Sequence, residues 1–239
     1  MIGLGTVINV GAIVVGGILG LFGGKWLKPE VQETVMRANG VCVLFIGIAG
    51  VMENMLTVTD GKLSASGTMM FIISIALGGL VGSLLKIDEL LERFGKWLKV
   101  KSGNGKDEKF LEGFISATMT VCIGAMAIVG SVQDGIYGDY STLAAKSVLD
   151  FIIVLVMAAS LGVGCIFSAV PVAIFQGTFT VLARIIEPLL TEAALTNLSL
   201  VGSALIFCVG LNLIWKNTVK VANLLPSLVF AVVYGLIGL

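Results

Sequence analysis

MIGLGTVINVGAIVVGGILGLFGG, residues 1–24, contains no charged side chain. A helix needs about 20 apolar residues to cross the hydrocarbon core of a bilayer, and this stretch is long enough. No lysine or arginine stands ahead of the apolar run, whereas a cleaved secretory signal starts with a basic segment. We therefore expect a permanent first transmembrane helix.

Outward from this stretch, the chain can be divided at every Asp, Glu, Lys and Arg. The remaining uncharged stretches of similar length are 63–85, 113–133, 151–183, 193–215 and 221–239. A shorter stretch, 38–52, crosses the bilayer if its helix continues past Glu53 to Val58. The stretch 151–183 is too long for one helix and contains Pro171, so we expect two elements there. The sequence predicts an all-α polytopic transmembrane helix bundle of seven to eight spans, forming one domain over residues 1–239.

Composition supports a bilayer environment and excludes several classes of function. Hydrophobic residues make up 57% of the chain and charged residues 13%, against about 25% charged in soluble domains. The net charge is zero and no basic patch suggests nucleic-acid binding. The chain has no histidine, and its four cysteines lie in apolar runs without paired close spacing. We expect neither an enzyme nor a bound cofactor or metal, and we expect the lipid bilayer as the main partner.

Basic residues indicate the orientation. The loop 25–37 holds three lysines and arginines, and the loop 86–112 holds seven. The positive-inside rule places both loops in the cytoplasm and the N-terminus outside. Within the second loop, apolar residues at helical spacing predict an amphipathic helix in the interface: Ile87, Leu90, Leu91, Phe94 and Leu98.

Similar segments recur along the chain. VCVLFIGIAGVMEN, from Val41, aligns without gaps with VCIGAMAIVGSVQD, from Val121, and FCVGLNLIWKN, ending at Asn217, is a weaker copy. Repeats of this kind predict units of common structure. We expect three repeated helical hairpins and a closing helix, over residues 1–58, 63–135, 147–217 and 221–239.

The third hairpin leaves two topologies open for residues 170–190, which either span the membrane or re-enter it. Eight spans place Lys216 and Lys220 in the cytoplasm, as the positive-inside rule favours. Repeat symmetry favours a re-entrant segment with both lysines outside. We prefer eight spans.

Glycines fall at helical spacing. The chain has 31 glycines, about twice the usual share. Two predicted helix faces carry the most regular sets: Gly16, Gly20 and Gly24, and Gly78 with Gly82. Small residues let helices approach closely in lipid, so these faces predict helix packing, although they also leave room for a solute or pore. The same faces suit a homo-oligomer.

Polar residues inside apolar stretches are candidates for solute binding, because they are costly at membrane depth. Asn9 and Asn212 offer amide groups that either bind a polar solute or join two helices. Asp150 precedes Phe151, with Lys146 one turn earlier as a partner, so it binds a cation or proton or is a wetted helix start.

Two further features of the sequence are candidate sites. Gln176 and Thr178 follow Pro171, where a broken helix exposes backbone groups or an ordinary helix begins. Glu53 and Asp134 end two matching helices, as an acidic vestibule or, more simply, as solvated ends.

Three segments carry a family resemblance. They are GTVINVGAIVVGGILGLFGGKWLKPEVQETVMRANGVCVLFIGI, from Gly5; LGVGCIFSAVPVAIFQGTFT, from Leu161; and VGLNLI with KVANLLPSL, between Val209 and Leu228. In this order they resemble the bacterial membrane family called domain of unknown function 554. The resemblance implies a polytopic inner-membrane protein with a transport role, and it supplies no site residue.

Two hypotheses for function follow. The first is a secondary transporter or channel for an unidentified small solute or ion, driven by an ion gradient or passive because no Walker-type phosphate loop is present. The alternative is a scaffold or sensor that does not transport and acts through the loop 86–112.

Overall fold

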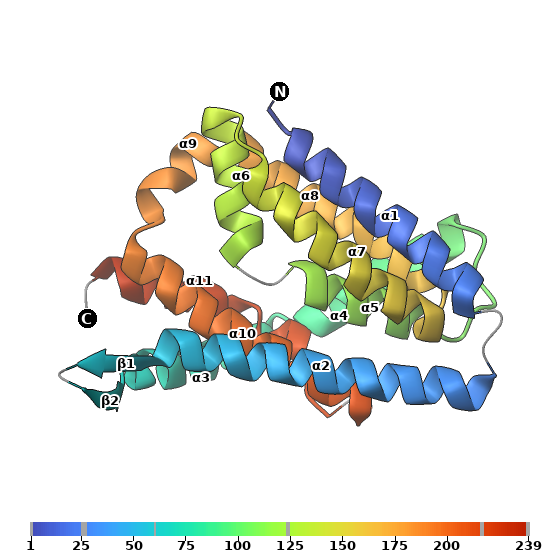
Figure 1. The fold of residues 1–239 in the computed structure, drawn as a ribbon, viewed down its shortest axis with the longest axis horizontal. Coiled ribbons are helices and arrows are strands. Elements are labelled where there is room, and N and C mark those ends of the chain that lie inside the picture. The colour runs from blue at the N-terminus through green and yellow to red at the C-terminus, as the bar shows by residue number, and fades with distance from the viewer. Residues whose placement is uncertain (1, 25–27, 60, 123–124, 216–217, 238–239) are drawn as a thin grey trace.

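The computed structural model describes residues 2–24, 28–59, 61–122, 125–215 and 218–237 (Figure 1). The elements in chain order are α1 (Leu4–Gly24), α2 (Pro29–Met55), β1 (Leu56–Thr59), β2 (Lys62–Ala65), α3 (Thr68–Leu84), α4 (Ile87–Lys101), α5 (Phe110–Cys122), α6 (Ala125–Tyr137), α7 (Ser141–Leu161), the 3-10 helix η1 (Val163–Ser168), α8 (Ala169–Val181), α9 (Ala183–Ile186), η2 (Glu187–Leu189), α10 (Glu192–Ile214), η3 (Val221–Leu224) and α11 (Pro226–Ile237). The two strands form one antiparallel hairpin, with Leu56 opposite Ala65.

Several helices match the dimensions of a bilayer. In the described parts of the chain, five are long and apolar enough to cross: α1, α2, α7, η1 with α8, and α10. Two bent pairs, α3 with α4 (56°) and α5 with α6 (62°), raise the number to seven, and η3 with α11 forms a shorter apolar helix. The prediction of an all-α polytopic bundle is confirmed.

The helices form two groups that meet along part of their length (Figure 1). In one group α1 packs along α7, and α6 and α8 pack beside them; in the other α2 packs along α10, and α3 packs along α11. The groups meet where α2 contacts α7, and the ribbons diverge from there. Helices adjacent in sequence are therefore not always partners, since α1 and α2 each pack on a helix from the far half of the chain.

Glycines allow the closest of these approaches. A Cβ added at Gly16, Gly20 or Gly24 of α1 would collide with a backbone carbonyl oxygen of α7, those of Phe151, Leu155 and Ala159 in turn. Both series of residue numbers rise together, so α1 and α7 run parallel. Gly78 and Gly82 of α3 lie equally close to the backbone of Ser227 and Asn223, in antiparallel order.

Helix boundaries correct two expectations. α2 begins at Pro29, so most of the predicted loop 25–37 is helical; a proline in the first turn and the acidic Glu30 both suit a helix start. α7 begins at Ser141, well before Phe151, so Asp150 lies inside this helix and not at its start. The amphipathic helix expected in the loop 86–112 is present as α4.

The long apolar stretch 151–183 contains two elements, as expected, but the break is not at Pro171. The chain turns at Gly162, which has a φ of 84°, a conformation that favours glycine. Pro171 lies in the first turn of α8, where proline fits an ordinary helix. Residues 163–181 run as one helical segment long enough to span.

The segment that contains η3 packs against the start of α4. The Nζ atom of Lys220 lies 2.8 Å from the Oδ2 atom of Asp88, and the backbone N–H of Asp88 donates to the side-chain oxygen of Asn223 (2.8 Å). Lys220 therefore lies beside the start of α4, and the preferred eight-span topology stays a prediction. The three-hairpin repeat stays a prediction.

Candidate functional site

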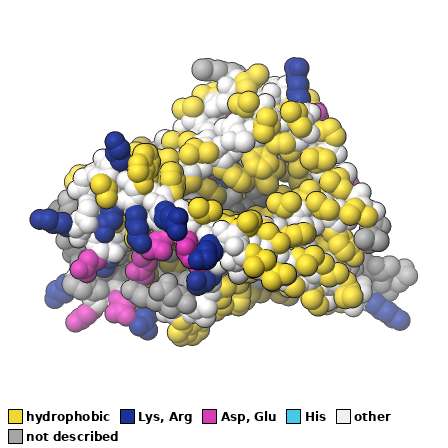
Figure 2. All heavy atoms as spheres, turned by 180° about the vertical axis from the view of Figure 1, so that it is seen from behind, with side chains coloured by type: hydrophobic (Ala, Val, Ile, Leu, Met, Phe, Trp, Pro, Cys, Tyr) yellow, Lys and Arg dark blue, Asp and Glu magenta, His cyan; other side chains and the backbone are white. Residues whose placement is uncertain are grey.

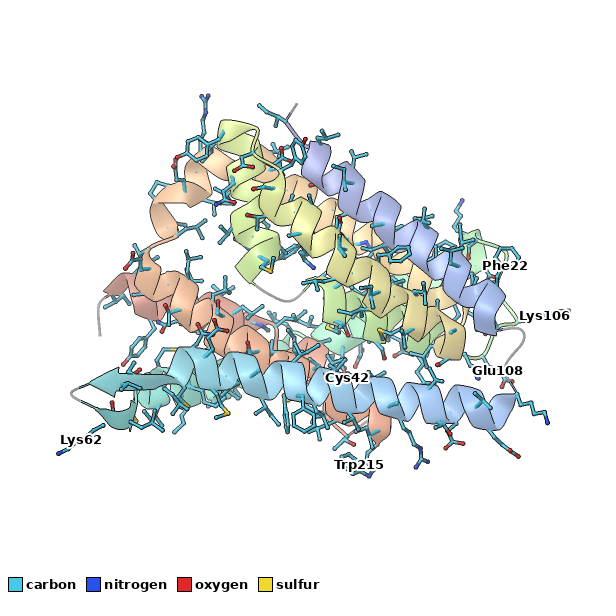
Figure 3. The ribbon with its side chains drawn as sticks, viewed as in Figure 1. Phe22, Cys42, Lys62, Lys106, Glu108 and Trp215 are labelled. Carbon is cyan, nitrogen blue, oxygen red and sulfur yellow. The ribbon has the colours of Figure 1, made fainter. Side chains whose placement is uncertain are left out.

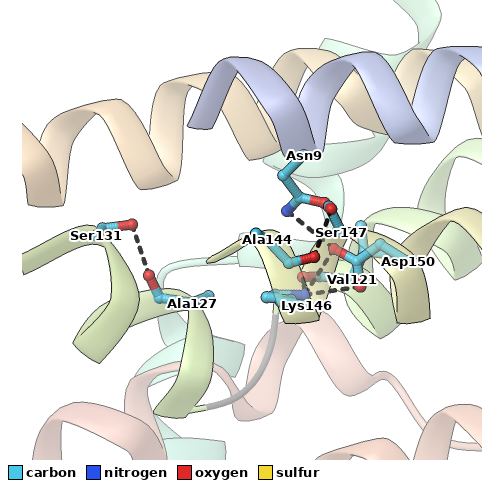
Figure 4. A network of polar contacts seen from close by, with 8 residues as sticks. All are labelled: Asn9, Val121, Ala127, Ser131, Ala144, Lys146, Ser147 and Asp150. Carbon is cyan, nitrogen blue, oxygen red and sulfur yellow. Dashed lines mark hydrogen bonds and ion pairs between the residues drawn. The ribbon is translucent and has the colours of Figure 1, made fainter. Parts of the chain in front are cut away.

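A buried ion pair lies in the first half of α7. Lys146 and Asp150 are one helical turn apart and are 6% and 2% exposed. The Nζ atom of Lys146 donates to both carboxylate oxygens of Asp150 at 2.7 Å (Figure 4). The amide Nδ2 of Asn9, on α1, donates to Oδ2 of Asp150 at 3.0 Å. Because charges this deep are costly unless paired and hydrogen-bonded, the three side chains depend on one another.

The same lysine contacts a helix end. Nζ of Lys146 donates to the backbone carbonyl of Val121 at 2.8 Å. α5 ends at Cys122, and α6 begins at Ala125 in a direction bent by 62°. The last carbonyls of a helix have no partner within it, so a bent span leaves acceptors inside the protein. Lys146 satisfies one of them and links the break to Asp150.

The structure brings together some of the predicted site residues and separates others. Asn9 and Asp150 are in direct contact. Gln176 lies on α8, is 1% exposed, and neither polar atom of its amide has a hydrogen-bond partner. Thr178 is exposed on the same helix, and its hydroxyl donates to the carbonyl of Ile174. Asn212 lies elsewhere, at the end of α10.

Asn212 supports the chain that follows α10. Its side-chain nitrogen donates to the carbonyl of Val219 (2.7 Å), and its oxygen accepts from the N–H of the same residue (2.9 Å). Both polar atoms are therefore used locally. Asn212 therefore holds the segment that follows α10, and its role in solute binding stays a prediction.

The interpretation of Asp134 as a solvated helix end or part of a vestibule is wrong. Its side chain is fully buried on α6, whereas Glu53 is exposed on α2. Oδ2 of Asp134 accepts from the backbone N–H of Gly5 at 2.9 Å. The first N–H groups of a helix lack intrahelical partners, so this carboxylate caps α1 from another helix. No local pattern in the sequence predicts a contact between residues so far apart.

A cavity of about 520 Å³ opens between α4, α5, α10 and η3. Its wall contains the charged residues Asp88, Glu92, Glu112 and Lys220, together with Asn212. Met119 of α5 also lines it, two residues before Val121. The hydrogen bond from Lys220 holds the pKa of Asp88 below its ordinary range. The cavity thus extends from a charged mouth along α5 toward the helix break.

The two ends of the molecule differ in their side chains. Figure 3 shows Lys106 and Glu108 at one end and Lys62, in the β-hairpin, at the other. From behind, charged side chains gather near the first of these ends, and hydrophobic ones cover much of the remaining face (Figure 2). α4 contributes the exposed ion pairs of Lys86 with Glu89 and Lys96 with Glu92. An apolar body with one charged end is typical of a membrane-embedded protein.

Comparison with known proteins gives a consistent result. The chain is 30% identical over 228 residues to "Uncharacterized membrane protein YdfK" of Bacillus subtilis, covering 94% of this chain and 92% of that protein. It is 29% identical over 236 residues to "Uncharacterized protein YqgA" of Escherichia coli, covering 95% and 94%. No solved structure matches. The model of the family described as "Protein of unknown function (DUF554)" matches residues 4–236. The chain is a multi-pass membrane protein that belongs to the DUF554 family.

Proposed function

We propose that the protein is a secondary transporter or channel that moves a small polar solute or an ion across the bacterial inner membrane. The observation that carries this proposal is the bent α5–α6 span, because the carbonyl of Val121 near the end of α5 accepts a hydrogen bond from Lys146 of the buried Lys146–Asp150 pair. Many transporters build their substrate sites from interrupted helices, in which unwound carbonyls and helix ends face the solute. The C-terminal end of α5 carries partial negative charge and the N-terminal end of α6 partial positive charge.

The cavity supports this assignment because it supplies an approach. It reaches Met119, within one turn of the carbonyl that Lys146 contacts. Beyond Met119 along α5 lies the carbonyl of Val121, which accepts a hydrogen bond from the Lys146 ammonium of α7. Lys146 and its partner Asp150 offer hydrogen bonds that a polar solute can exchange with.

We place the end that carries α4 in the cytoplasm and the β-hairpin outside. The seven basic residues of the loop 86–112 favour this orientation, and Lys220 lies at the same end. We further propose that the glycine faces of α1 and α3 serve helix packing within one chain. We propose no enzymatic activity.

The test combines ligand screening with flux. The purified protein should gain thermal stability from one solute class in a panel of ions, amino acids, organic acids and vitamins, because a ligand that binds only the folded state stabilises it. In proteoliposomes the same solute should be taken up. Asp150→Asn should abolish uptake, and the exposed Asp139→Asn should retain it as the matched control.

Two results would contradict the proposal. The first is a complete panel with neither stabilisation nor uptake, which would favour a scaffold or sensor acting through the loop 86–112. The second is full uptake by Asp150→Asn, which would remove the buried pair from the transport path.

A further inference from the structure

A second set of buried polar atoms lies on α1, α6 and α8, and the proposed solute site does not use it. Five oxygen atoms in this set have no hydrogen-bond partner: Oγ1 of Thr6, Oδ1 of Asn9, Oδ1 of Asp134, Oε1 of Gln176 and Oγ1 of Thr180. Their side chains are at most 8% exposed. Buried polar atoms are nearly always paired, so a cluster of unpaired acceptors points to a ligand.

Contacts between α1, α6 and α8 place the members of this set near one another. Asp134 reaches the N–H of Gly5, next to Thr6. On the following residue of α6, a Cβ added at Gly135 would collide with the carbonyl oxygen of Thr180. Asp134 therefore lies between the start of α1 and the end of α8.

The register of α1 against α8 adds Gln176 to the junction. A Cβ added at Gly17 would collide with Ile166 in η1, and Thr6 lies on the same face of α1, three turns earlier. Three turns correspond to about 16 Å along the axis. Helices α1 and α8 run antiparallel. A path of about 16 Å that starts at Ile166 and follows η1 into α8 therefore ends near Gln176. Thr180 follows Gln176 by one turn on the same buried face.

We infer that this junction binds a monovalent cation, with Na⁺ as the best fit to its chemistry. One carboxylate, two amide oxygens and two hydroxyls form a set of hard oxygen ligands with a single negative charge. Divalent Ca²⁺ and Mg²⁺ favour sites with more carboxylates or several retained waters. Among the described residues, none makes an ion pair with Asp134, so a bound cation supplies the missing charge.

Asn9 connects this cation site to the ion pair. Its Nδ2 atom donates to Asp150, while its Oδ1 atom belongs to the unpaired set. A cation held by Oδ1 would fix the amide in the orientation that stabilises Asp150. This coupling role rests on the proposed transport function, whereas cation binding itself does not.

Thermal unfolding of the purified protein tests the inference at fixed pH and ionic strength. Choline chloride is replaced stepwise by NaCl, with LiCl and KCl in parallel. The wild-type melting temperature should rise saturably with Na⁺, because the ion binds only the folded protein. Asp134→Asn should weaken the apparent Na⁺ affinity at least about tenfold, as expected for loss of a charged ligand. Asp139→Asn, on the exposed loop before α7, is the matched control.

A second variant protects the test against simple misfolding. Gln176→Met keeps the size of the side chain and removes two polar atoms that have no partner. In choline it should be at least as stable as wild type, since an unsatisfied buried amide is destabilising. In Na⁺ it should gain less stability than wild type. A variant that is at least as stable as wild type in choline but less stabilised than wild type by Na⁺ indicates that Gln176 binds the ion. A residue that only packs would change stability equally in both salts.

Three outcomes overturn the inference: equal stability in choline and in all three alkali salts, a Na⁺ effect that persists in both variants, or stabilisation that follows pH alone and marks a proton site. The transport proposal is tested separately, because it depends on solute uptake in proteoliposomes and the cation site depends on thermal unfolding. Saturable Na⁺ binding that both variants weaken would support the site even in a protein that transports nothing.

Discussion

At the scale of single residues, the Lys146–Asp150 pair joins three helices. Each carboxylate oxygen of Asp150 accepts from Lys146, one also accepts from Asn9 of α1, and the lysine donates to the end of α5. Such a pair contributes little net stability when intact, because desolvation offsets the attraction. Removing one partner is different, since it leaves a buried charge alone.

Replacement of Lys146 tests this asymmetry. Lys146→Met should destabilise the protein by about 3–5 kcal/mol, because Asp150 loses its charge partner and keeps only the Asn9 donor, and the carbonyl of Val121 loses its donor. The double variant Lys146→Met with Asp150→Asn should recover part of the loss. Denaturation in detergent measures both, and Lys62→Met in the exposed hairpin should leave stability unchanged. A single variant as stable as wild type would show that the pair is not buried in the folded protein.

At the scale of elements, the first apolar stretch was predicted well, because it contains no charge. α1 extends over Leu4–Gly24, within the expected 1–24. Dividing the sequence at charged residues misplaced the start of α7. Lys146 and Asp150 neutralise each other inside this span, but in the sequence two charges so close together indicate a loop. Division also concealed the bend between α5 and α6, since both helices are apolar.

The sequence predicted individual site residues but not the contacts between them. Asn9 and Asp150 were predicted separately, and the structure brings them into contact. Their juxtaposition, and that of Asp134 with Gly5, depends on how α1 packs against helices from the later half of the chain. One-dimensional periodicity carries no information on such partners.

Two glycines of α1 separate packing from helix propensity. A Cβ at Gly20 would meet the carbonyl of Leu155 and the Cβ of Ala158, whereas Gly23 has nothing within 4 Å. Gly20→Ala should lower the melting temperature, because α1 must move away from α7. Gly23→Ala should leave it unchanged or raise it, since alanine favours a helix by about 1 kcal/mol over glycine.

The comparison is made in detergent by thermal unfolding of both variants. Equal effects at the two positions would contradict a packing role for the glycine face. Oligomeric state is measured in parallel, because dissociation in Gly23→Ala alone would assign the outward face of α1 to a second copy.

At the scale of the whole molecule, the two ends of the bundle should face different compartments. Single cysteines at Lys62 and at Glu108, in a background where the four native cysteines are replaced, report on each end. A thiol reagent that does not cross membranes should label Lys62→Cys in intact cells and Glu108→Cys only after permeabilisation. The reverse pattern would invert the orientation proposed from basic residues.

The ion pair between Asp88 and Lys220 gives a pH-dependent link between α4 and η3. The pKa of Asp88 is lowered from its ordinary 3.8, first by the hydrogen bond from Lys220, and the pKa of Lys220 is raised from 10.5 by the same contact. The contribution of the pair is therefore complete between these ordinary values. It is lost as pH falls through the folded-state pKa of Asp88 or rises through that of Lys220.

Melting temperature against pH tests this link in wild type and Asp88→Asn. Wild type should be slightly more stable at neutral pH, since exposed pairs contribute little, and the difference should disappear in acid below the pKa of Asp88. Glu108→Gln is the control, with no such pH-dependent difference expected. A constant difference across the acid range would show that Asp88 acts through packing and not through its charge.

The pairing of α1 with α7 also bears on how the chain is made. Synthesis proceeds from the N-terminus, so α1 leaves the ribosome long before its parallel partner exists. During that interval the glycine face and Asn9 have only lipid or the insertion machinery as neighbours. α7 itself enters with a lysine and an aspartate one turn apart, which can pair within the same helix and insert as a neutral unit. The bundle therefore assembles late in synthesis, because α1 can pack against α7 only after α7 has been made.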